Sequence, residues 1–497
     1  MNNYFNTNIH DPKYQQNNIF SLLNEKNHLV AGDFWGIQNF IFEKLSTKNA
    51  AKVLRAKSAF IQIFMQILAK YICKKAQIDE KHILTTNAGK FEIIVPKDLD
   101  IEPIQKEVNE YFLKNFYGLS GVGICKVEVS KDEWKNDYKN FRKKLAEEIE
   151  KLKFKKFNLT DQNPLLKYDT NLTNETLCKI CNIRKIEKEN CNICNIFIVL
   201  GKQLTYGNEI ETDSKKLGID FIEEPIKIIL NKRIKSYIPS KDQKPLEFEE
   251  IANNSCKGKE IGIKALGILK ADVDGMGNLI KNSNLTESFN NFDEFSKGID
   301  SFFSIYVTDK LRNDFRNIYT VFSGGDDLFL VGAWDEILSF SRELRNEFID
   351  YVNHDLTLSF GIAIAKPTTP ISYLANHTEE LLEKSKSIDG KDSITIWNET
   401  IKWKNYLKVF KILNRKFKDF EVNSSSLYKL LKLCDMSKSV KNDIKNTIWR
   451  SKLNYLFRRN IDKKYFCILK TLEVTMKKFP KETKVFLYEY IYKNRKN

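Results

Sequence analysis

Histidine is scarce in this chain, which has only five histidines among its 497 residues. They are dispersed, so a metal centre built from clustered histidines is not expected. The five are His10, His28, His82, His354 and His377. The chain also lacks an apolar run long enough to span a bilayer, and its Asn-rich and Gln-rich first 18 residues lack a signal-peptide core. We therefore expect a cytoplasmic protein with no membrane partner.

The most informative motif is Ser-Gly-Gly-Asp-Asp at residues 323–327, which lies between the apolar runs 318–322 and 328–332. The runs are typical of strands, and the glycine pair predicts a hairpin with two carboxylates at its tip. An earlier apolar run, 265–271, ends in Asp-Val-Asp-Gly-Met-Gly at 272–277. If the two strands are neighbours in one sheet, their acidic ends form an oxygen-rich site for Mg²⁺ or Mn²⁺. Either motif alone is also compatible with a solvated loop without chemistry.

The segments around this hairpin predict a known topology. Helical periodicity covers residues 335–351 and 371–387, and strand-like runs cover 356–365 and 393–397. Together with the preceding strands, the order indicates an α+β fold, a ferredoxin-like palm with one extra strand. A lysine near the end of its last helix, such as Lys386, has the reach to bind a triphosphate as a point charge. For any single lysine, a solvated surface position is the simpler interpretation.

An earlier part of the chain repeats this layout in degenerate form. A short strand at 28–33 leads to an amphipathic helix at 51–74, and strands at 82–86 and 91–95 flank a turn. That turn contains no carboxylate, and Asp33 alone cannot hold two metal ions. We therefore expect no catalysis from this first palm.

Taken together, these motifs resemble the large palm-domain subunit of type III CRISPR effector complexes, and the Csm-type (III-A) branch is the most similar. Members of that family combine an Asp-Val-Asp strand end with a Gly-Gly-Asp-Asp hairpin, and their earlier palm opens with Gly-Asp-Ile-Ser-Gly-Ile-Gln. This chain has Gly-Asp-Phe-Trp-Gly-Ile-Gln at 32–38, followed by Leu-Arg-Ala-Lys-Ser at 54–58. Four separate motifs in the family's order make the resemblance specific.

The resemblance implies an RNA-guided antiviral effector subunit that converts ATP into cyclic oligoadenylates when target RNA is bound. Guide RNA, target RNA and the other effector subunits are then its partners, and two Mg²⁺ or Mn²⁺ ions are its catalytic cofactors. The implied catalytic and metal-binding residues are Asp272, Asp326 and Asp327. The candidate nucleotide-binding residues are Val273, Asp274, Ser323, Gly324, Gly325 and Lys386. A free-standing cyclic-dinucleotide cyclase and a non-catalytic ribonucleoprotein scaffold are the alternatives.

Four cysteines between the palms form two Cys-x-x-Cys pairs, Cys178 with Cys181 and Cys191 with Cys194. This pattern is typical of a tetrahedral Zn²⁺ site, and four thiolates leave no open coordination position, which indicates a structural role. Two surface disulfides or four thiols without a function are the alternative, and the lack of a secretion signal favours zinc. The family carries a zinc element at the same position.

Positive charge is concentrated in the last hundred residues. Residues 401–497 contain 26 Lys and Arg against 8 Asp and Glu, an excess of +18 that is larger than the net +16 of the whole chain. Apolar and aromatic residues such as Tyr406, Val409 and Leu413 recur there at helical spacing. We predict a helical domain with a basic surface, suited to an RNA backbone or an acidic protein partner. A solvated face in a Lys-rich sequence is the alternative.

These features divide the chain into five parts. They are an N-terminal extension (1–27), a degenerate first palm (28–153), a zinc-binding linker domain (154–262), a second palm with the Gly-Gly-Asp-Asp site (263–400) and a basic helical domain (401–497). Many members of the family carry a His-Asp nuclease domain before the first palm, whereas here His10-Asp11 is a chance-level dipeptide. We therefore expect that nuclease domain and its DNA-cutting activity to be absent.

Overall fold

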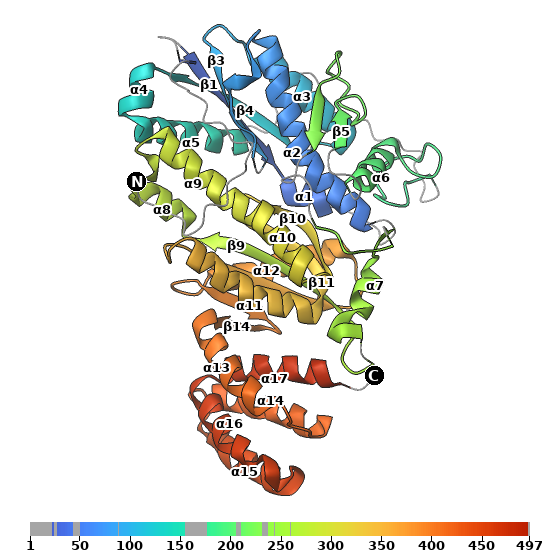
Figure 1. The fold of residues 1–497 in the computed structure, drawn as a ribbon, viewed down its shortest axis with the longest axis vertical. Helices are drawn as coiled ribbons and strands as arrows, with labels where there is room; N and C mark the ends of the chain where they lie inside the picture. The colour runs from blue at the N-terminus through green and yellow to red at the C-terminus, as the bar shows by residue number, and fades with distance from the viewer. Residues whose placement is uncertain are drawn as a thin grey trace.

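The computed structural model is elongated, and two palm domains and a helical domain follow one another along its long axis (Figure 1). The structure describes residues 22–23, 27–42, 50–87, 89–154, 176–204, 210–230, 237–242, 244–258 and 260–495. The N-terminal extension predicted for residues 1–27 lies outside the described residues except at 22–23 and 27, and His10-Asp11 lies outside them as well.

The first palm is a four-stranded antiparallel sheet in the order β2-β3-β1-β4. Its long helix α2 contacts β3 of the sheet, and Phe60, Phe64 and Leu68, one turn apart along the helix, are fully buried. This amphipathic spacing is what makes the segment a helix that covers a sheet. The elements are β1 (Asn27–Trp35), α1 (Ile37–Phe42), α2 (Ala50–Lys75), β2 (Ile83–Thr85), β3 (Lys90–Pro96), α3 (Glu102–Phe116), β4 (Gly121–Val129), α4 (Lys131–Asn136) and α5 (Tyr138–Phe154).

The second palm is a six-stranded sheet in the order β10-β11-β9-β12-β13-β14. Its first four strands have the same order along the sheet as those of the first palm, so the predicted duplication of a ferredoxin-like palm is confirmed. The elements are β9 (Leu266–Asp274), α8 (Met276–Asn282), α9 (Phe289–Ser301), a π-helical turn (Phe302–Tyr306), α10 (Val307–Asp314), β10 (Ile318–Gly324), β11 (Asp327–Ala333), α11 (Trp334–Tyr351), β12 (Thr357–Ala365), α12 (Ile371–Lys386), β13 (Ser393–Ile396) and β14 (Glu399–Lys402). Strand β14 was not predicted, and it crosses the expected domain boundary at residue 400.

Strand β9 lies in the middle of this sheet, and its two faces differ in character. Leu269, Ala271 and Val273 point to one face and belong to a buried apolar core beneath α11. Because side chains alternate along a strand, Lys270 and Asp272 point to the other face, which α12 covers. The sheet therefore holds a row of charged side chains under α12.

A linker region joins the two palms, and α2 is the element around which all three parts pack. Helix α2 contacts both α6 of the linker and β10 of the second palm. At the palm–palm contact the Phe42 and Phe329 rings lie 4.7 Å apart, and the Tyr319 hydroxyl donates to the Ala51 carbonyl. The linker elements are α6 (Asn192–Gln203), β5 (Ile210–Asp213), β6 (Lys227–Leu230), β7 (Ser240–Lys241), β8 (Lys244–Pro245) and α7 (Phe248–Asn253).

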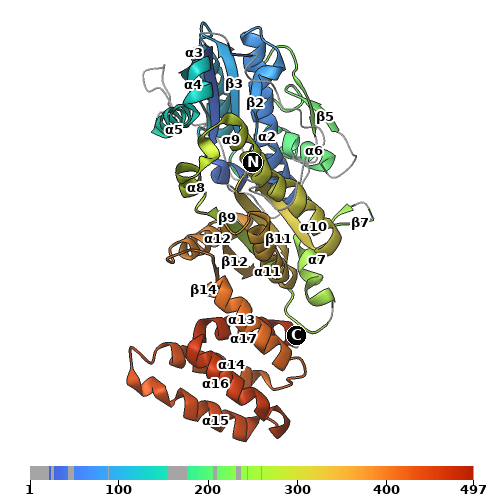
Figure 2. The same ribbon diagram turned by 60° about the vertical axis from the view of Figure 1, so that its left-hand side comes forward.

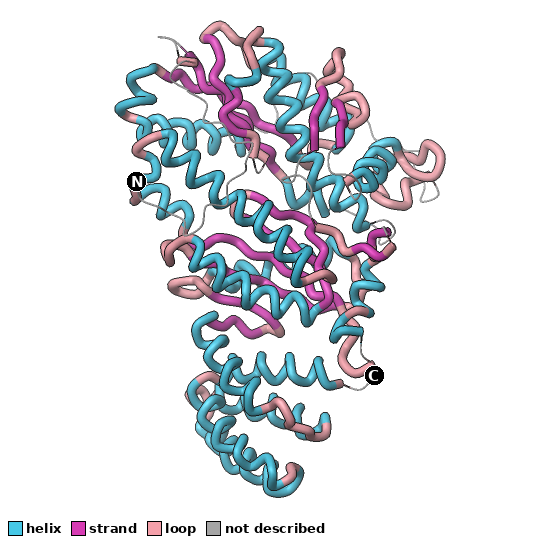
Figure 3. The backbone as a smooth tube through the Cα atoms, in the orientation of Figure 1, coloured by secondary structure: helices cyan, strands magenta, loops and turns pink. Residues whose placement is uncertain are grey.

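The C-terminal part is a helical bundle, as predicted, and its last helix returns to the second palm (Figures 2 and 3). Arg342 on α11 makes a two-pronged ion pair with Glu489 on α17, at 2.9 and 3.2 Å, and Tyr406 donates to the same carboxylate. The main helices are α13 (Trp403–Lys416), α14 (Ser424–Lys438), α15 (Trp449–Asn460), α16 (Phe466–Lys478) and α17 (Pro480–Asn494). Within the described residues, no helix has both the length and the apolar character needed to cross a membrane.

Candidate active site

The hairpin between β10 and β11 brings its acidic tip to the end of β9. Gly325 adopts a left-handed backbone (φ +63°) that other residues seldom tolerate, which explains a glycine at the turn. Its N–H donates to Asp300 Oδ1 on α9 at 3.2 Å, and the Val273 N–H donates to the Asp326 carbonyl at 3.3 Å. The tip is therefore attached to two neighbouring elements of the palm.

Two of the three predicted catalytic carboxylates face each other across adjacent strands. Asp272 and Asp327 are directly opposite in the antiparallel pairing of β9 and β11, and side chains opposed in this way lie close enough to interact. Burial raises the pKa of Asp272 to about 7, an effect that Lys386 opposes and the charges of Asp327 and Asp326 reinforce. Burial also raises the pKa of Asp327. Asp326 is exposed at the hairpin tip.

Two lysines supply the positive charge that this carboxylate pair requires. Lys386, at the end of α12, places its ammonium 2.7 Å from Asp272 Oδ2. Burial lowers the pKa of Lys386, but its contact with Asp272 outweighs that effect and the net shift is upward. Lys270 lies two residues before Asp272 on β9 and forms an ion pair with Glu379 on α12. The structure thus brings the predicted lysine to the predicted acids.

The chemistry of the donors fits a hard divalent cation. Carboxylate oxygens are the ligands that Mg²⁺ and Mn²⁺ prefer, and the Asp272–Asp327 pair already attracts a cationic group, the Lys386 ammonium. In this arrangement the three carboxylates do not gather into one compact set of ligand atoms. Among the described residues, only the four cysteines place three or more such atoms within 4.8 Å of one another.

Two other predicted nucleotide-binding residues have side chains engaged within the protein. The Ser323 hydroxyl is buried and donates to the carbonyl of Phe303, which joins the hairpin to the π-helical turn. Asp274 is 5% exposed, and its Oδ2 accepts from Thr357 and Ser359 on β12 and from the backbone N–H of Asp392. In this structure, both side chains support the walls of the site.

Sequence reasoning missed three charged residues that shape this site. They are Asp300, which holds the hairpin turn, and the pair formed by Lys270 and Glu379. A signal for Lys270 was present, because a lysine inside an otherwise apolar strand is unusual. No comparable signal marked Asp300 or Glu379, since both lie on ordinary amphipathic helices whose placement only the tertiary fold determines.

The first palm supplies a wall to the site and no carboxylate from its own hairpin turn. A side chain at Gly324 would meet the Gln62 amide of α2 at 3.5 Å, so the first palm approaches the Gly-Gly-Asp-Asp hairpin closely. In the first palm, the position on β1 that carries Asp33 pairs with Lys90 of β3. The described residues of the β2–β3 turn contain no second acid, and the lack of catalysis there stays a prediction.

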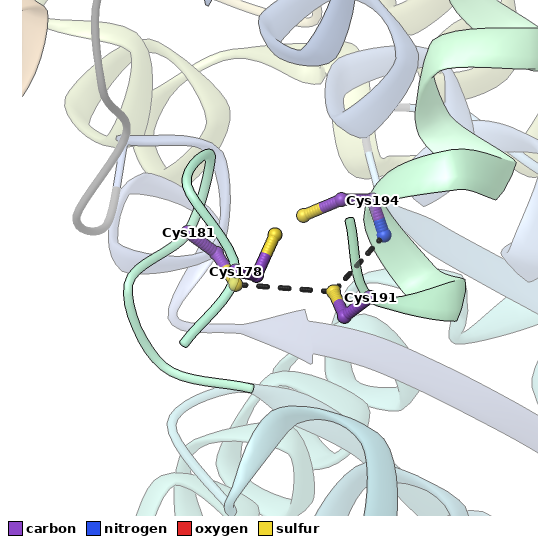
Figure 4. Close-up of side chains that lie close together, drawn as sticks. All are labelled: Cys178, Cys181, Cys191 and Cys194. Carbon is purple, nitrogen blue, oxygen red and sulfur yellow. Dashed lines mark hydrogen bonds between the residues drawn. The ribbon is translucent and has the colours of Figure 1, made fainter. Parts of the chain in front are cut away.

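The four cysteines between the palms form a compact cluster (Figure 4). All four are buried, and their sulfur atoms lie within 4.8 Å of one another. The Cys191 Sγ, at the start of α6, accepts from the Cys194 N–H at 3.4 Å and lies 3.9 Å from the Cys181 Sγ. No described cysteine forms a disulfide. Four clustered thiols are the donor set of a structural zinc site.

Comparisons with known proteins match both palms. The Cas10/Cmr2 second palm domain matches residues 265–395, and the Csm1 subunit domain B matches residues 26–171. A similar protein, from Streptococcus thermophilus, is described as a CRISPR system single-strand-specific deoxyribonuclease Cas10/Csm1 of subtype III-A. It is 24% identical over 418 residues, which cover 76% of this chain and 54% of that protein. The chain thus spans about half the length of this relative.

Solved structures with the same fold are Csm1–Csm4 cassettes. One, in complex with cA3, has a TM-score of 0.67 at 20% sequence identity and covers 91% of this chain and 70% of the other. A second, in complex with one ATP, has a TM-score of 0.69 at 21% identity and covers 94% and 70%. The architecture of two palms and a helical bundle thus belongs to a fold already known.

Proposed function

We propose that this chain, a homologue of the Cas10/Csm1 proteins of subtype III-A, joins ATP into cyclic oligoadenylates when target RNA is bound. Its partners would be a Csm4-like subunit, the other subunits of the effector complex, guide RNA and target RNA, in the cytoplasm. Related structures bound to ATP and to cA3 support this choice of substrate and product. The experiment below also tests the two alternatives, a free-standing cyclic-dinucleotide cyclase and a non-catalytic ribonucleoprotein scaffold.

The observation that carries the proposal is the pairing of Asp272 with Asp327 beside two lysines. We infer that Asp272, Asp326 and Asp327 hold two Mg²⁺ or Mn²⁺ ions, with the Val273 carbonyl as a further oxygen donor. When bound, such ions lower the pKa of an attacking hydroxyl and neutralise a departing pyrophosphate. This use explains why the fold keeps several carboxylates together, although their mutual repulsion and burial are unfavourable.

The remaining residues of the site would bind and orient the nucleotide. Gly324 and Gly325 leave room for a phosphate or base to approach the hairpin backbone. Lys386 would exchange its contact with Asp272 for the triphosphate, because a flexible ammonium suits a polyanion. Ser323 and Asp274 would contribute indirectly, because their side chains hold the hairpin and the end of β9 in place.

We further propose that the four-cysteine cluster binds one structural Zn²⁺ and that the five-part division of the chain describes its domains. A bound ion would join the 176–186 loop to α6, which packs against α2 of the first palm. Zinc would then stabilise the linker against which both palms rest.

The experiment compares the wild-type complex with a complex that contains Asp326→Ala and Asp327→Ala. Each is incubated with ATP, Mg²⁺ and target RNA, and the products are identified by mass. We expect the double variant to assemble and bind RNA normally but to make no cyclic product. Asp309→Ala is the matched control, because the Asp309 side chain on α10 is 45% exposed and pairs with Arg312 on the same helix. Normal product from the double variant would show that the site is assigned to the wrong residues.

A further inference from the structure

A buried lysine lies beside the carboxylate pair, and the proposed chemistry does not yet account for it. The side chain of Lys270 is 7% exposed, and burial lowers its pKa. Burying an ammonium is costly, and an apolar residue would fill this position on β9 more cheaply. The position therefore keeps a positive charge for a reason other than packing.

Among the described residues, the Lys270 ammonium forms its ion pair with Glu379, and Glu379 also contacts the first palm. Glu379 Oε2 on α12 forms the ion pair with Lys270 and also accepts from the Gln38 side-chain amide on α1 at 3.1 Å. Gln38 and Glu379 are 341 residues apart in sequence. One carboxylate oxygen thus connects the first palm to the central strand of the second.

Helix α12 presents a second charge to the same strand. Lys386 follows Glu379 by seven residues, which is two helical turns, so both side chains lie on the side of α12 that faces β9. Two ion pairs of opposite polarity result, one between Glu379 and Lys270 and one between Lys386 and Asp272. Within the described residues the ion pair of Lys270 is with Glu379, although Asp327 and Asp272 also act on its pKa.

We propose that Glu379 is a positioning residue that keeps the Lys270 ammonium away from Asp272 and Asp327. The hydrogen bond from Gln38 then makes the position of the Glu379 carboxylate depend on the first palm. The proposal rests on the proposed function, because it assumes that divalent ions bind the carboxylate pair. If Glu379 loses its charge, Lys270 turns to the nearest remaining acids and competes with the ions. The first palm can then influence metal binding by a residue that never touches metal or nucleotide.

The test measures Mn²⁺ binding to the full-length chain by titration calorimetry. Binding at the carboxylate pair is the part of the heat signal that is lost in the Asp327→Asn variant. Glu379→Gln should weaken this binding about tenfold, the order expected when one nearby charge is redirected toward the site. Gln38→Ala should weaken it less, in the same direction. Lys270→Met should tighten it, and the Glu379→Gln/Lys270→Met double variant should regain at least wild-type affinity. Glu380→Gln is the matched control, since its side chain is 71% exposed and faces His377 on the same helix.

Two results would overturn the inference while leaving the proposed function intact. One is a Glu379→Gln variant with the Mn²⁺ affinity of the Glu380→Gln control, with or without a lower unfolding temperature. The other is a double variant that binds as weakly as Glu379→Gln alone, because Lys270 would then not be the competitor. Wild-type protein without any Asp327-dependent Mn²⁺ binding would instead overturn the proposed function itself.

Discussion

Two aspartates on the same strand face, Asp272 and Asp274, should respond in opposite ways to the same substitution. Asp274 Oδ2 accepts three hydrogen bonds, from Thr357 at 2.9 Å, from Ser359 at 2.9 Å and from the Asp392 N–H at 3.1 Å. A hydrogen bond to a charged acceptor contributes roughly 1.5–3 kcal/mol. All three donors reach the same oxygen, so asparagine can keep an oxygen there, but the three bonds lose their charge. Its NH₂ group then replaces Oδ1, which is buried and has no hydrogen-bond partner among the described residues.

We expect Asp274→Asn to lower the free energy of unfolding by about 2–3 kcal/mol, since it disrupts a buried set of bonds that joins β9 to β12 and β13. In a domain of this size the unfolding temperature should fall by roughly 5–10 °C. Asp272→Asn should be neutral or slightly stabilising in metal-free buffer. Its carboxylate is buried beside Asp327, and burial raises its pKa to about 7, so the ionised form is unfavourable in the folded protein.

The assay is thermal and denaturant unfolding of the full chain in chelator, with nucleotide product measured in parallel on the complex. Asp272→Asn should abolish product at unchanged stability, whereas Asp274→Asn should lose stability and keep part of its activity at low temperature. Equal stability losses in the two variants would refute this account. So would an Asp274→Asn variant that is fully stable and inactive, because Asp274 would then act directly on nucleotide or metal.

Three further predictions follow from other parts of the molecule. Purified protein should contain one zinc per chain by elemental analysis, and Cys191→Ser should lose it together with stability; folded, zinc-free wild type would contradict this. Burial alone would raise the pKa of Glu489, but Arg342 outweighs it and the pKa lies at about 2. The ion pair therefore stabilises the fold above about pH 4.5, and this stabilisation is lost as the pH falls toward 2. Glu489→Gln should lower the free energy of unfolding by about 3 kcal/mol at pH 7 and make it less dependent on acid pH. The same acid-dependent fall in unfolding free energy in the wild type and the variant would refute this. If the basic bundle contacts RNA, changing the exposed Arg458 and Arg459 on α15 to Gln should reduce the slope of log affinity against log salt concentration by roughly 1–2. An unchanged slope would show that these two side chains face solvent and do not contact RNA.

Local patterns were enough to predict the two palms and the position of the hairpin. Apolar runs, glycine at the turn and apolar helix faces are determined by a few neighbouring residues. They predicted the order of strands and helices along the second palm as far as residue 397 and the first three strands of the first palm, whereas strand β4 (Gly121–Val129) was not predicted. The approach of Asp327 to Asp272 followed from the expectation that the two strands are neighbours. The catalytic, nucleotide-binding and zinc assignments stay predictions that need the experiments above.

Features that depend on distant residues or on unusual turns escaped prediction. Strand β14 was missed because its hairpin turns at Trp397 and Asn398, both with positive φ, and contains no glycine. Its first residue, Glu399, is buried against Lys438 and Lys484 of the helical bundle, which no strand pattern reveals. The ion pair of Lys270 with Glu379 likewise joins residues 109 positions apart, so only the packing of α12 on β9 brings it about.

The central claim is that this chain makes a cyclic oligoadenylate under RNA control, and one measurement tests it most directly. The complex assembled with guide RNA and partner subunits is incubated with ATP and Mg²⁺, with or without target RNA, and the products are separated and identified by mass. The account predicts cyclic oligomers of AMP that form only with target RNA and vanish in the Asp272→Asn variant. A cyclic dinucleotide made without RNA, or no nucleotide product from the wild-type complex, would contradict it.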